Sequence, residues 1–393
     1  MLAAVPLAPY GACVRDVAIF RNNLFRVSEP FVAQQAEPLR RHRPLYLGRL
    51  RFGDAPPGAV SLALQDSGLW RSLPAIAWQV LARSPRGFER LLAGRRPSLI
   101  HAHFGIDGVH ALPLARRLGV PLVTTFHGFD ATLSTAALLT SPAWANYPLF
   151  RRRLAREGAL FLCVSSFIRD QVLAQGFPAS RTRVHYTGVD CAATRPRDPG
   201  EETATILHVA RLVAMKGTAT LLHAFAALAQ HDAAASLVVI GDGELRRPLH
   251  ALAAALGLAG RVRFLGARPH AEVMAWMRQA AMLVLPSVRT RTGRVEGLGM
   301  VLLEAAASGV PVIGSRVGGI PEGVLDGETG FLVPPRDAAA LCARMQTLLA
   351  DPELRRRMGA QARRFVERRF DMARQTETLE GFYDDVVAGR LPG

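Results

Sequence analysis

Short apolar runs alternate with longer helical stretches rich in Ala, Leu and Arg along the whole chain. This alternation is typical of parallel sheets whose strands are joined by crossover helices, so we predict an α/β fold. The predicted strands are Val14–Phe20, Leu99–His103, Pro121–Phe126, Leu160–Val164, Arg183–Tyr186, Thr205–Val209, Ser236–Ile240, Val262–Phe264, Met282–Leu285 and Val310–Ile313. The first half of the chain holds as many of them as the second, which indicates two sheets.

An aperiodic segment separates the two groups of strands. Thr187-Gly188-Val189-Asp190 is followed by residues 191–202, which contain two prolines and no apolar period. A chain of 393 residues with 49% hydrophobic content is also too long for one core. We therefore predict two Rossmann-like domains facing across a cleft, residues 1–190 and 191–393. We expect the last helix, about 371–393, to pack back on the first domain.

Apolar stretches and cysteines indicate the compartment. Leu73–Ala82 and Met300–Gly314 are short or interrupted well before the ~20 residues that a membrane span needs. Met1–Cys13 lacks a basic leader, so we expect no secretion signal. The four cysteines are Cys13, Cys163, Cys191 and Cys342, which form no CxxC pair. The chain is therefore predicted to be cytoplasmic and without a zinc site.

The formal net charge of +16 and the pI near 11.1 predict attraction to phosphates, acidic lipids or nucleic acid. Basic clusters fall at residues 40–43, 151–156 and 355–357, in stretches that we expect to be helical. Each cluster is either a solvated helix face or, for the two N-terminal ones, a contact with an anionic membrane at its inner face. Nucleic acid is disfavoured because no aromatic-interleaved basic strand or recognition helix accompanies the charge.

The most informative segment runs from Arg294 to Ile313. It predicts a glycine-rich loop that opens a helix ending at Gly309, followed by a strand beginning at Pro311. The amides of Gly297, Leu298, Gly299, Met300 and Val301, at the positive end of that helix, suit a diphosphate. Glu296 precedes these amides. Glu304 lies about two turns inside an Ala/Leu helix, where a ribose would supply the hydroxyl partners that a carboxylate needs.

A second segment, Ile206–Gly217, follows a strand and opens a helix. It contains Lys216, the only lysine in the chain. An ammonium on a flexible stem reaches a phosphate as a point charge, whereas the Arg211 guanidinium binds phosphate oxygens bidentately. Together the two groups would neutralise the charge on a departing nucleoside diphosphate.

Two further strand ends predict walls of the donor site. Gly241 and Gly243, with Glu244, form a Gly-x-Gly turn after a strand, and Ser287 follows another strand. The carboxyl ends of strands in an open parallel sheet commonly border a ligand. The alternative is that both are ordinary tight turns, and the missing third glycine argues against NAD.

Histidines end two predicted strands of the first half. His101 and His103 close one strand and His127 follows the next, so all three project towards the same edge. We interpret His127, beside Gly128, as a polar contact to the transferred sugar, and leave open whether the other two are structural. Near the start, Ser28 or Glu29 fits the cap of the first helix, with Pro30 in its first turn.

In this order and spacing, the motifs resemble glycosyltransferase family 4, retaining enzymes of the GT-B fold, across most of the chain. Glu296 and Glu304 match the E-x7-E pair of the family, Arg211 and Lys216 its phosphate-binding pair, and His127 its sugar-contacting histidine. The stretches SEPFVAQQ, HAHFG, TTFHGFDA and EGLGMVLLEA are most similar to transferases of colanic-acid-type exopolysaccharide pathways. Residues 21–27 depart from the family because they lack its frequent Gly-Gly pair.

The resemblance implies transfer of a sugar from a nucleoside diphosphate, UDP first and GDP next, to a hydroxyl acceptor with retained anomeric configuration. It implies front-face attack, with Glu296 holding sugar hydroxyls and Glu304 the ribose. Without an Asp-x-Asp motif, we expect no metal requirement. The acceptor, a glycan or lipid-linked glycan of a surface polysaccharide, is not assigned to residues. The alternatives are a nucleotide-sugar epimerase of the same fold, a pyridoxal-dependent phosphorylase, which would need Lys216 as its Schiff base, and a non-catalytic binding subunit.

Overall fold

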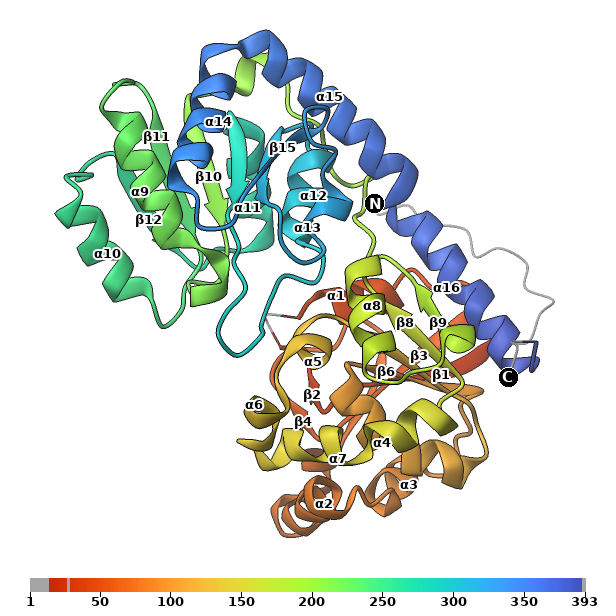
Figure 1. The fold of residues 1–393 in the computed structure, drawn as a ribbon. Helices are drawn as coiled ribbons and strands as arrows, with labels where there is room; N and C mark the ends of the chain where they lie inside the picture. Colours follow the sequence, from red (N-terminus) through yellow and green to blue (C-terminus); the bar gives the residue numbers. More distant parts are fainter. Residues whose placement is uncertain (1–13, 27–28, 391–393) are drawn as a thin grey trace, which may run out of the picture. The chain divides into compact units, whose positions relative to one another are not determined.

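The computed structural model describes residues 14–26 and 29–390 (Figure 1). The Met1–Cys13 stretch and Ser28, for which we made predictions, lie outside the described residues. Contacts divide the chain into two compact units. The first unit comprises residues 1–125, 141–161 and 376–393, and the second comprises residues 126–140 and 162–375.

The first sheet is parallel, with seven strands in the order β5-β3-β1-β6-β7-β8-β9. Its strands are β1 (Arg15–Phe20), β3 (His42–Gly48), β5 (Val60–Ala63), β6 (Leu99–His103), β7 (Leu122–Phe126), β8 (Leu160–Cys163) and β9 (Thr182–Val184). In the register of β1, Ile19 pairs with Tyr46 on one side and with His101 on the other. A separate two-stranded ribbon pairs β2 (Asn23–Leu24) with β4 (Leu50–Arg51). Side chains at the carboxyl ends of β1 and β6 therefore share one edge.

The basic cluster at residues 40–43 is not helical, so the prediction of a helix there is wrong. Its last two residues begin β3, and the first two lie in the preceding turn. The reason is that residues 45–48 are buried in the sheet, so tertiary pairing overrides a local sequence that lacks a clear strand period. Glu29 does not cap the first helix either, because Pro30 occupies the N-cap position.

The helices of this part of the chain are joined by α16, which comes from near the C-terminal end of the sequence. Their bounds are α1 (Phe31–Ala36), α2 (Leu69–Ala82), α3 (Arg86–Leu92), α4 (Gly105–Leu118), α5 (Phe129–Thr132), α6 (Thr135–Leu139), α7 (Pro142–Glu157), α8 (Ser166–Ala174) and α16 (Met372–Val387). The buried Glu380 carboxylate of α16 accepts hydrogen bonds from the amides of Arg40 and Arg41, at 2.8 and 2.6 Å. These bonds secure α16 to the start of β3.

The second sheet is also parallel, in the order β12-β11-β10-β13-β14-β15. Its strands are β10 (Thr205–Val209), β11 (Ser236–Ile240), β12 (Val262–Gly266), β13 (Met282–Leu285), β14 (Val312–Ser315) and β15 (Gly330–Val333). The strand order reverses at β10, which pairs with β11 on one side and β13 on the other. Ligands of doubly wound sheets bind at such a reversal, outside the carboxyl ends of the strands.

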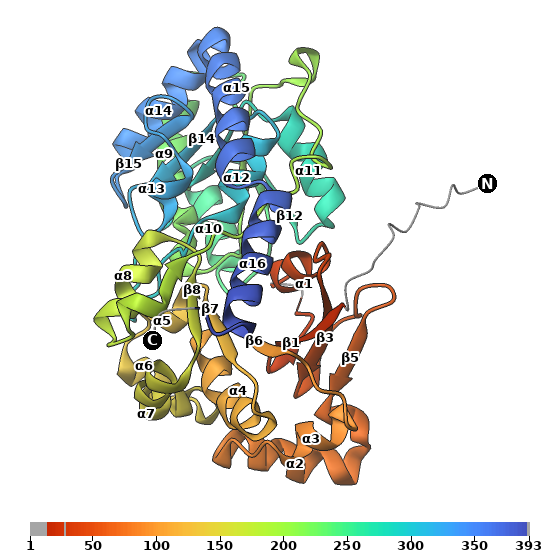
Figure 2. The same ribbon diagram turned by 90° about the vertical axis from the view of Figure 1, so that its right-hand side faces the viewer.

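Helices cover both faces of this second sheet (Figure 2). Their bounds are α9 (Thr218–Ala229), α10 (Arg246–Ala255), α11 (His270–Gln279), α12 (Met300–Ala307), α13 (Ile320–Gly323), α14 (Ala338–Ala350) and α15 (Pro352–Arg369). Ile206 of β10 packs with α9, α10 and α14, whereas its neighbour Leu207 packs with α11, α12 and α13. Because alternate residues of a strand face opposite sides, these strands are buried on both faces.

The glycine-rich segment folds nearly as the sequence predicted. Helix α12 ends at Ala307, Gly309 follows it with a φ of 70°, and β14 begins at Val312. Four strands of the first half, β2, β3, β4 and β5, and β15 of the second were not predicted. Among the helices of the described residues, none combines the length and the hydropathy needed to cross a bilayer.

Candidate functional site

Three loops meet by close backbone contact at the carboxyl ends of β10, β11 and β13, within the second unit. A Cβ atom on Gly217 would lie 1.9 Å from the carbonyl oxygen of Pro286, and one on Gly241 would lie 1.9 Å from that of Ala210. Gly241 also has a φ of 134°, which favours glycine. Gly241 is therefore required for the close approach of the two loops, as the tight-turn alternative predicts.

The side chains of Lys216 and Glu296 meet at this edge. Lys216 Nζ lies 2.6 Å from Glu296 Oε2, and Ser287 Oγ donates to the same oxygen at 3.3 Å. The Lys216 and Glu296 side chains are each 14% exposed. The structure thus brings together three predicted site residues from three different loops, through a charge-assisted contact that is largely screened from water.

The glycine loop after Glu296 turns directly into α12. Gly299, with a φ of 86°, is the N-cap, so the amides of Met300 and Val301 lie in the first helical turn and have no partner inside the helix. Leu298 is buried and packs the loop against the rest of the unit. The Lys216 ammonium lies at the start of this loop, because its partner Glu296 directly precedes the loop residues.

Gly318 and Gly319, which were not among the predicted site residues, support this loop. The amide of Gly319 donates to the carbonyl of Glu296 at 3.0 Å, and a Cβ atom on Gly319 would lie 1.9 Å from the carbonyl oxygen of Gly297. Glu322, one turn later, accepts hydrogen bonds from the amides of Ser166 and Phe167 at 2.9 Å each. Two glycines directly after a strand and before a helix-opening Ile-Pro were the available signal.

His127 lies against the same loop. A Cβ atom on Gly297 would be 2.2 Å from the carbonyl oxygen of His127, and Gly128 follows with a φ of 147°. The hydroxyl of Ser165 donates to the carbonyl of Gly297 at 2.7 Å. The backbone around His127 and the backbone after Glu296 are therefore in contact, although these segments lie far apart in the sequence.

Arg211 occupies a more open position than Lys216. It is exposed, and it forms no ion pair with any other residue that the structure describes. Burial lowers the pKa of the nearby Arg294, the positive charge of Arg211 lowers it further, and Glu244 opposes both effects. Arg211, Glu244 and Arg294 thus form a mixed-charge rim at which Arg211 remains available to an anion.

Glu304 does not meet Glu296 directly but pairs with a histidine that the sequence analysis did not single out. Glu304 Oε1 lies 3.4 Å from His270 Nε2, at the start of α11. The hydrogen bond to Glu304 raises the pKa of His270, against the effect of burial. The position of His270 after β12, at the carboxyl edge of the sheet, was the signal that could have found it.

For His101 and His103 the sequence left open whether they are structural, and hydrogen bonds within the first unit hold His101 in place. It is fully buried, its Nδ1 lies 2.6 Å from the hydroxyl of Tyr383, and its Nε2 lies 2.7 Å from that of Thr125. His103 is also buried, with its ring 4.4 Å from the ring of His101. Both ring nitrogens of His101 are occupied, so the structural alternative applies to it.

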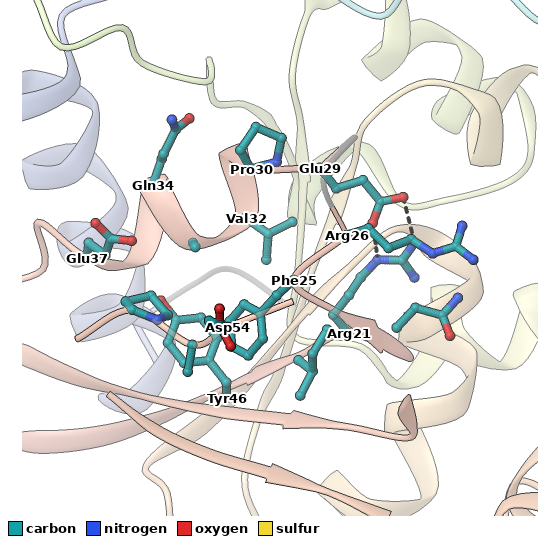
Figure 3. A pocket seen from close by; sticks show the side chains of 15 residues that line it. Arg21, Phe25, Arg26, Glu29, Pro30, Val32, Gln34, Glu37, Tyr46 and Asp54 are labelled. Carbon is teal, nitrogen blue, oxygen red and sulfur yellow. Dashed lines mark hydrogen bonds and ion pairs between the residues drawn. The ribbon is translucent and has the colours of Figure 1, made fainter. Parts of the chain in front are cut away.

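A cavity of about 400 Å³ opens beside α1 in the first unit (Figure 3). The rings of Phe25 and Tyr46, 5.1 Å apart, line it together with the carboxylates of Glu29, Glu37 and Asp54. Burial, with a smaller effect from the charge of Glu37, raises the pKa of the Tyr46 phenol. The cavity therefore offers the partly exposed ring of Phe25 and hydrogen-bond acceptors to a ligand.

A buried ion pair fixes one wall of this cavity. Arg21 Nη1 donates to Asp107 Oδ2 at 2.6 Å, and Arg21 Nε donates to Glu29 at 2.9 Å. Burial by itself lowers the pKa of Arg21, but the charges of Asp107 and Glu29 outweigh it and raise that pKa. Asp107 also accepts the amide of Asn22 at 3.1 Å, so the loop after β1 is anchored to the first turn of α4.

Comparison with known proteins identifies the family. The profile of group 1 glycosyl transferases matches residues 194–365, and that of glycosyltransferase family 4 matches residues 40–193. WcaL of Escherichia coli (strain K12), a colanic acid biosynthesis glycosyltransferase by name, is 35% identical over 256 residues, which are 64% of this chain and 61% of WcaL. The D-inositol 3-phosphate glycosyltransferase of Frankia alni is 34% identical over 301 residues, covering 70% of this chain and 71% of the relative.

The crystal structure of Anabaena Alr3699/HepE in complex with UDP and glucose superposes with a TM-score of 0.75 at 20% identity, over 94% of this chain and 100% of HepE. The similarity to HepE shows the fold. The chain belongs to glycosyltransferase family 4 and has the GT-B fold of two Rossmann-like domains, as the motifs predicted. The match to WcaL spans less than two thirds of the length of that relative.

Proposed function

We propose that this protein is a retaining glycosyltransferase that moves a sugar from a nucleoside diphosphate donor, a UDP-sugar first, to a hydroxyl group of a glycan or lipid-linked glycan. It acts in the cytoplasm, on acceptors of a surface polysaccharide pathway. The name of WcaL supports the pathway, and the UDP and glucose bound by HepE support the donor class. We propose that no divalent metal is required, because Lys216 and Arg211 supply the positive charge.

The observation that carries the proposal is the contact between Lys216 and Glu296 at the start of the glycine loop. In the donor complex, the ammonium would transfer from the carboxylate to the diphosphate, and the amides of Gly297 to Val301 would bind the same anion. Glu296 is then free to accept hydrogen bonds from hydroxyl groups of the transferred sugar. The same cations stabilise the departing diphosphate, whose charge rises in the transition state.

Arg211, His127 and Glu304 complete the proposed site. The exposed Arg211 binds a phosphate oxygen, and His127 contacts the sugar from beside Gly297. Glu304 holds the ribose hydroxyls, with His270 orienting its carboxylate at 3.4 Å. Gly241, Gly243, Glu244 and Ser287 border the nucleotide along the edge of the sheet.

The single lysine makes a direct test possible. An amine-acylating reagent can modify only Lys216 and the terminal amine, so peptide mass spectrometry reports on Lys216 alone. We expect UDP to protect Lys216 from acylation, with protection following UDP concentration, and adenosine at equal concentration not to protect it. Equal acylation with and without UDP, when UDP binding is confirmed by calorimetry, would remove Lys216 from the donor site.

We further propose that the acceptor sugar occupies the cavity of about 400 Å³ in the first unit. Sugar rings place their apolar faces against aromatic side chains, and carboxylates accept hydrogen bonds from their hydroxyl groups. Asp54→Asn should then raise the KM for the acceptor while leaving the KM for the donor unchanged. A donor-specific effect of this substitution would show that the cavity serves another purpose.

An acceptor-free incubation separates the transferase from the epimerase alternative. A transferase needs the acceptor for net turnover, whereas an epimerase isomerises the donor by itself. The presence of Lys216, Glu296, Arg211, His127 and Glu304 favours a catalytic protein over a binding subunit. A chelator should leave the turnover unchanged, and its complete loss would contradict the metal-independent proposal.

A further inference from the structure

Helix α2 exposes large apolar side chains and buries polar ones. The small polar side chains of Ser72 and Gln79 are buried, at 5% and 1% exposure. Trp70, Trp78 and Leu81 are exposed, at 87%, 63% and 71%. In a water-facing helix the apolar side packs on the core and the polar side meets solvent. The outward face of α2 therefore has the composition of a buried surface.

The exposed apolar residues of α2 form one continuous stripe along the helix. They recur at helical spacing and comprise Trp70, Leu73, Pro74, Ala77, Trp78, Leu81 and Ala82. Exposed apolar side chains are concentrated here, since four of the nine large hydrophobic side chains exposed among the described residues belong to this one helix. Leu149 belongs to α7, a helix that packs on α2, and is also exposed, at 67%.

Basic residues predominate in α2 and in the segment that follows it. Residues 69–96 contain six arginines and a single carboxylate, Glu89. Four of these arginines, Arg86, Arg90, Arg95 and Arg96, are exposed and form no ion pair within the described part of the chain. Helices α2, α3 and α7 lie together at one end of the first unit in both views (Figures 1 and 2).

We propose that α2 is an interfacial membrane anchor, whose apolar stripe enters the facing leaflet of an anionic phospholipid bilayer while the neighbouring arginines bind its headgroups. Tryptophan prefers the boundary between headgroups and acyl chains, and a helix with an apolar face and basic surroundings lies in the plane of that boundary. The stripe of α2 is too short to span a bilayer, which fits a helix that lies on the surface.

The positive charge of the exposed arginines near α2 favours an anionic bilayer over a second copy of the chain as the binding partner. Two such surfaces face to face would bring many unpaired arginines together, and the repulsion would oppose association. An anionic bilayer instead complements both the apolar stripe and its basic border. The proposal deepens the proposed function by placing the chain next to a lipid-linked acceptor, but the binding test below does not depend on sugar transfer.

The test uses the full chain and large vesicles, either of pure phosphatidylcholine or with about a third phosphatidylglycerol. We expect sedimentation with the anionic vesicles only, weakened by salt. Trp70→Ser with Trp78→Ser should lower the affinity by about tenfold or more. The matched control replaces two exposed leucines of the second unit, Leu139→Ser with Leu325→Ser, and should bind like the wild type.

Two double substitutions of arginine test whether these side chains contact the headgroups. Arg86→Gln with Arg90→Gln should weaken binding to anionic vesicles, whereas Arg356→Gln with Arg357→Gln, on exposed positions of α15, should not. The wild-type chain provides an independent reading if a variant fails to fold. Its tryptophan fluorescence should shift to shorter wavelength on the anionic vesicles and be quenched by brominated acyl chains.

Three results would overturn the proposal. The first is no binding of the wild type to either vesicle, and the second is equal binding of the tryptophan variant. The third is a concentration-dependent dimer in vesicle-free buffer that the tryptophan variant abolishes, since a second copy would then cover the stripe.

Discussion

Removal of the negative charge from Glu296 should have opposite effects on donor binding and on turnover. Glu296 holds the Lys216 ammonium at 2.6 Å, and both side chains are 14% exposed. We expect a diphosphate that binds Lys216 to compete with this carboxylate for the ammonium. Glu296→Gln retains the shape and removes the competitor, so we expect UDP to bind more tightly while sugar transfer slows.

The size of the effect follows from the ion pair. Breaking a fully buried pair costs about 3–5 kcal/mol, and an exposed pair contributes about 1 kcal/mol or less. A pair with these exposures lies between the limits, so about 1.4 kcal/mol is a reasonable contribution, which corresponds to about a tenfold change in affinity. Ser287, which shares the same oxygen, should hold the glutamine in place.

Isothermal titration calorimetry with UDP measures the change directly. We expect the Kd of Glu296→Gln to fall by about tenfold, and that of Lys216→Met to rise by at least as much. Asp326→Asn, which removes an exposed carboxylate elsewhere in the second unit, controls for net charge and should leave the Kd unchanged. Unchanged or weaker UDP binding by Glu296→Gln would refute the competition between carboxylate and diphosphate.

Three other substitutions test contacts that stabilise the candidate site and the first unit. Gly319→Ala should destabilise the protein by about 2 kcal/mol in urea unfolding, because its Cβ would meet the carbonyl of Gly297 at 1.9 Å, whereas Gly200→Ala has nothing within 4 Å and should be neutral. Asp107→Asn should cost about 3 kcal/mol in the same assay, since it leaves the buried Arg21 without its main partner, and a neutral result would contradict this role. The raised pKa of His270 means that its pair with Glu304 stabilises the fold below pH 6.5 and is lost as the pH rises through the raised value. The wild type should therefore exceed His270→Gln in Tm at acidic pH only, and a pH-independent difference would disprove this linkage.

Much of the fold could be predicted from local patterns. Each of the ten predicted strands overlaps an observed strand, because runs of buried β-branched and aliphatic residues identify strands that are covered on both faces. The strand β3 was missed because its sequence, His-Arg-Pro-Leu-Tyr-Leu-Gly, begins with charge and proline. Its burial depends on β1 and β5, which lie on either side of it in the sheet.

The residue types of the candidate site were also readable in advance. A lone lysine, a glycine loop before a helix and two glutamates are local features, and the sequence alone determined them. The residues that contact them in the folded chain could not be predicted from the sequence. His270 meets Glu304 and Gly319 meets Gly297 only because β12, β13 and β14 end at the same edge of the sheet.

Helix α2 shows most clearly what a local sequence pattern cannot predict, namely which face of a helix is buried. The sequence determined an apolar stretch at Leu73–Ala82, and apolar character by itself favours burial. Only the tertiary structure decided that Ser72 and Gln79 would face the protein and both tryptophans the solvent. Periodicity fixes which side chains share a face, because the helix repeat is local. Which face is covered depends on the elements that pack against it, and the long-range contacts of the folded chain set that choice.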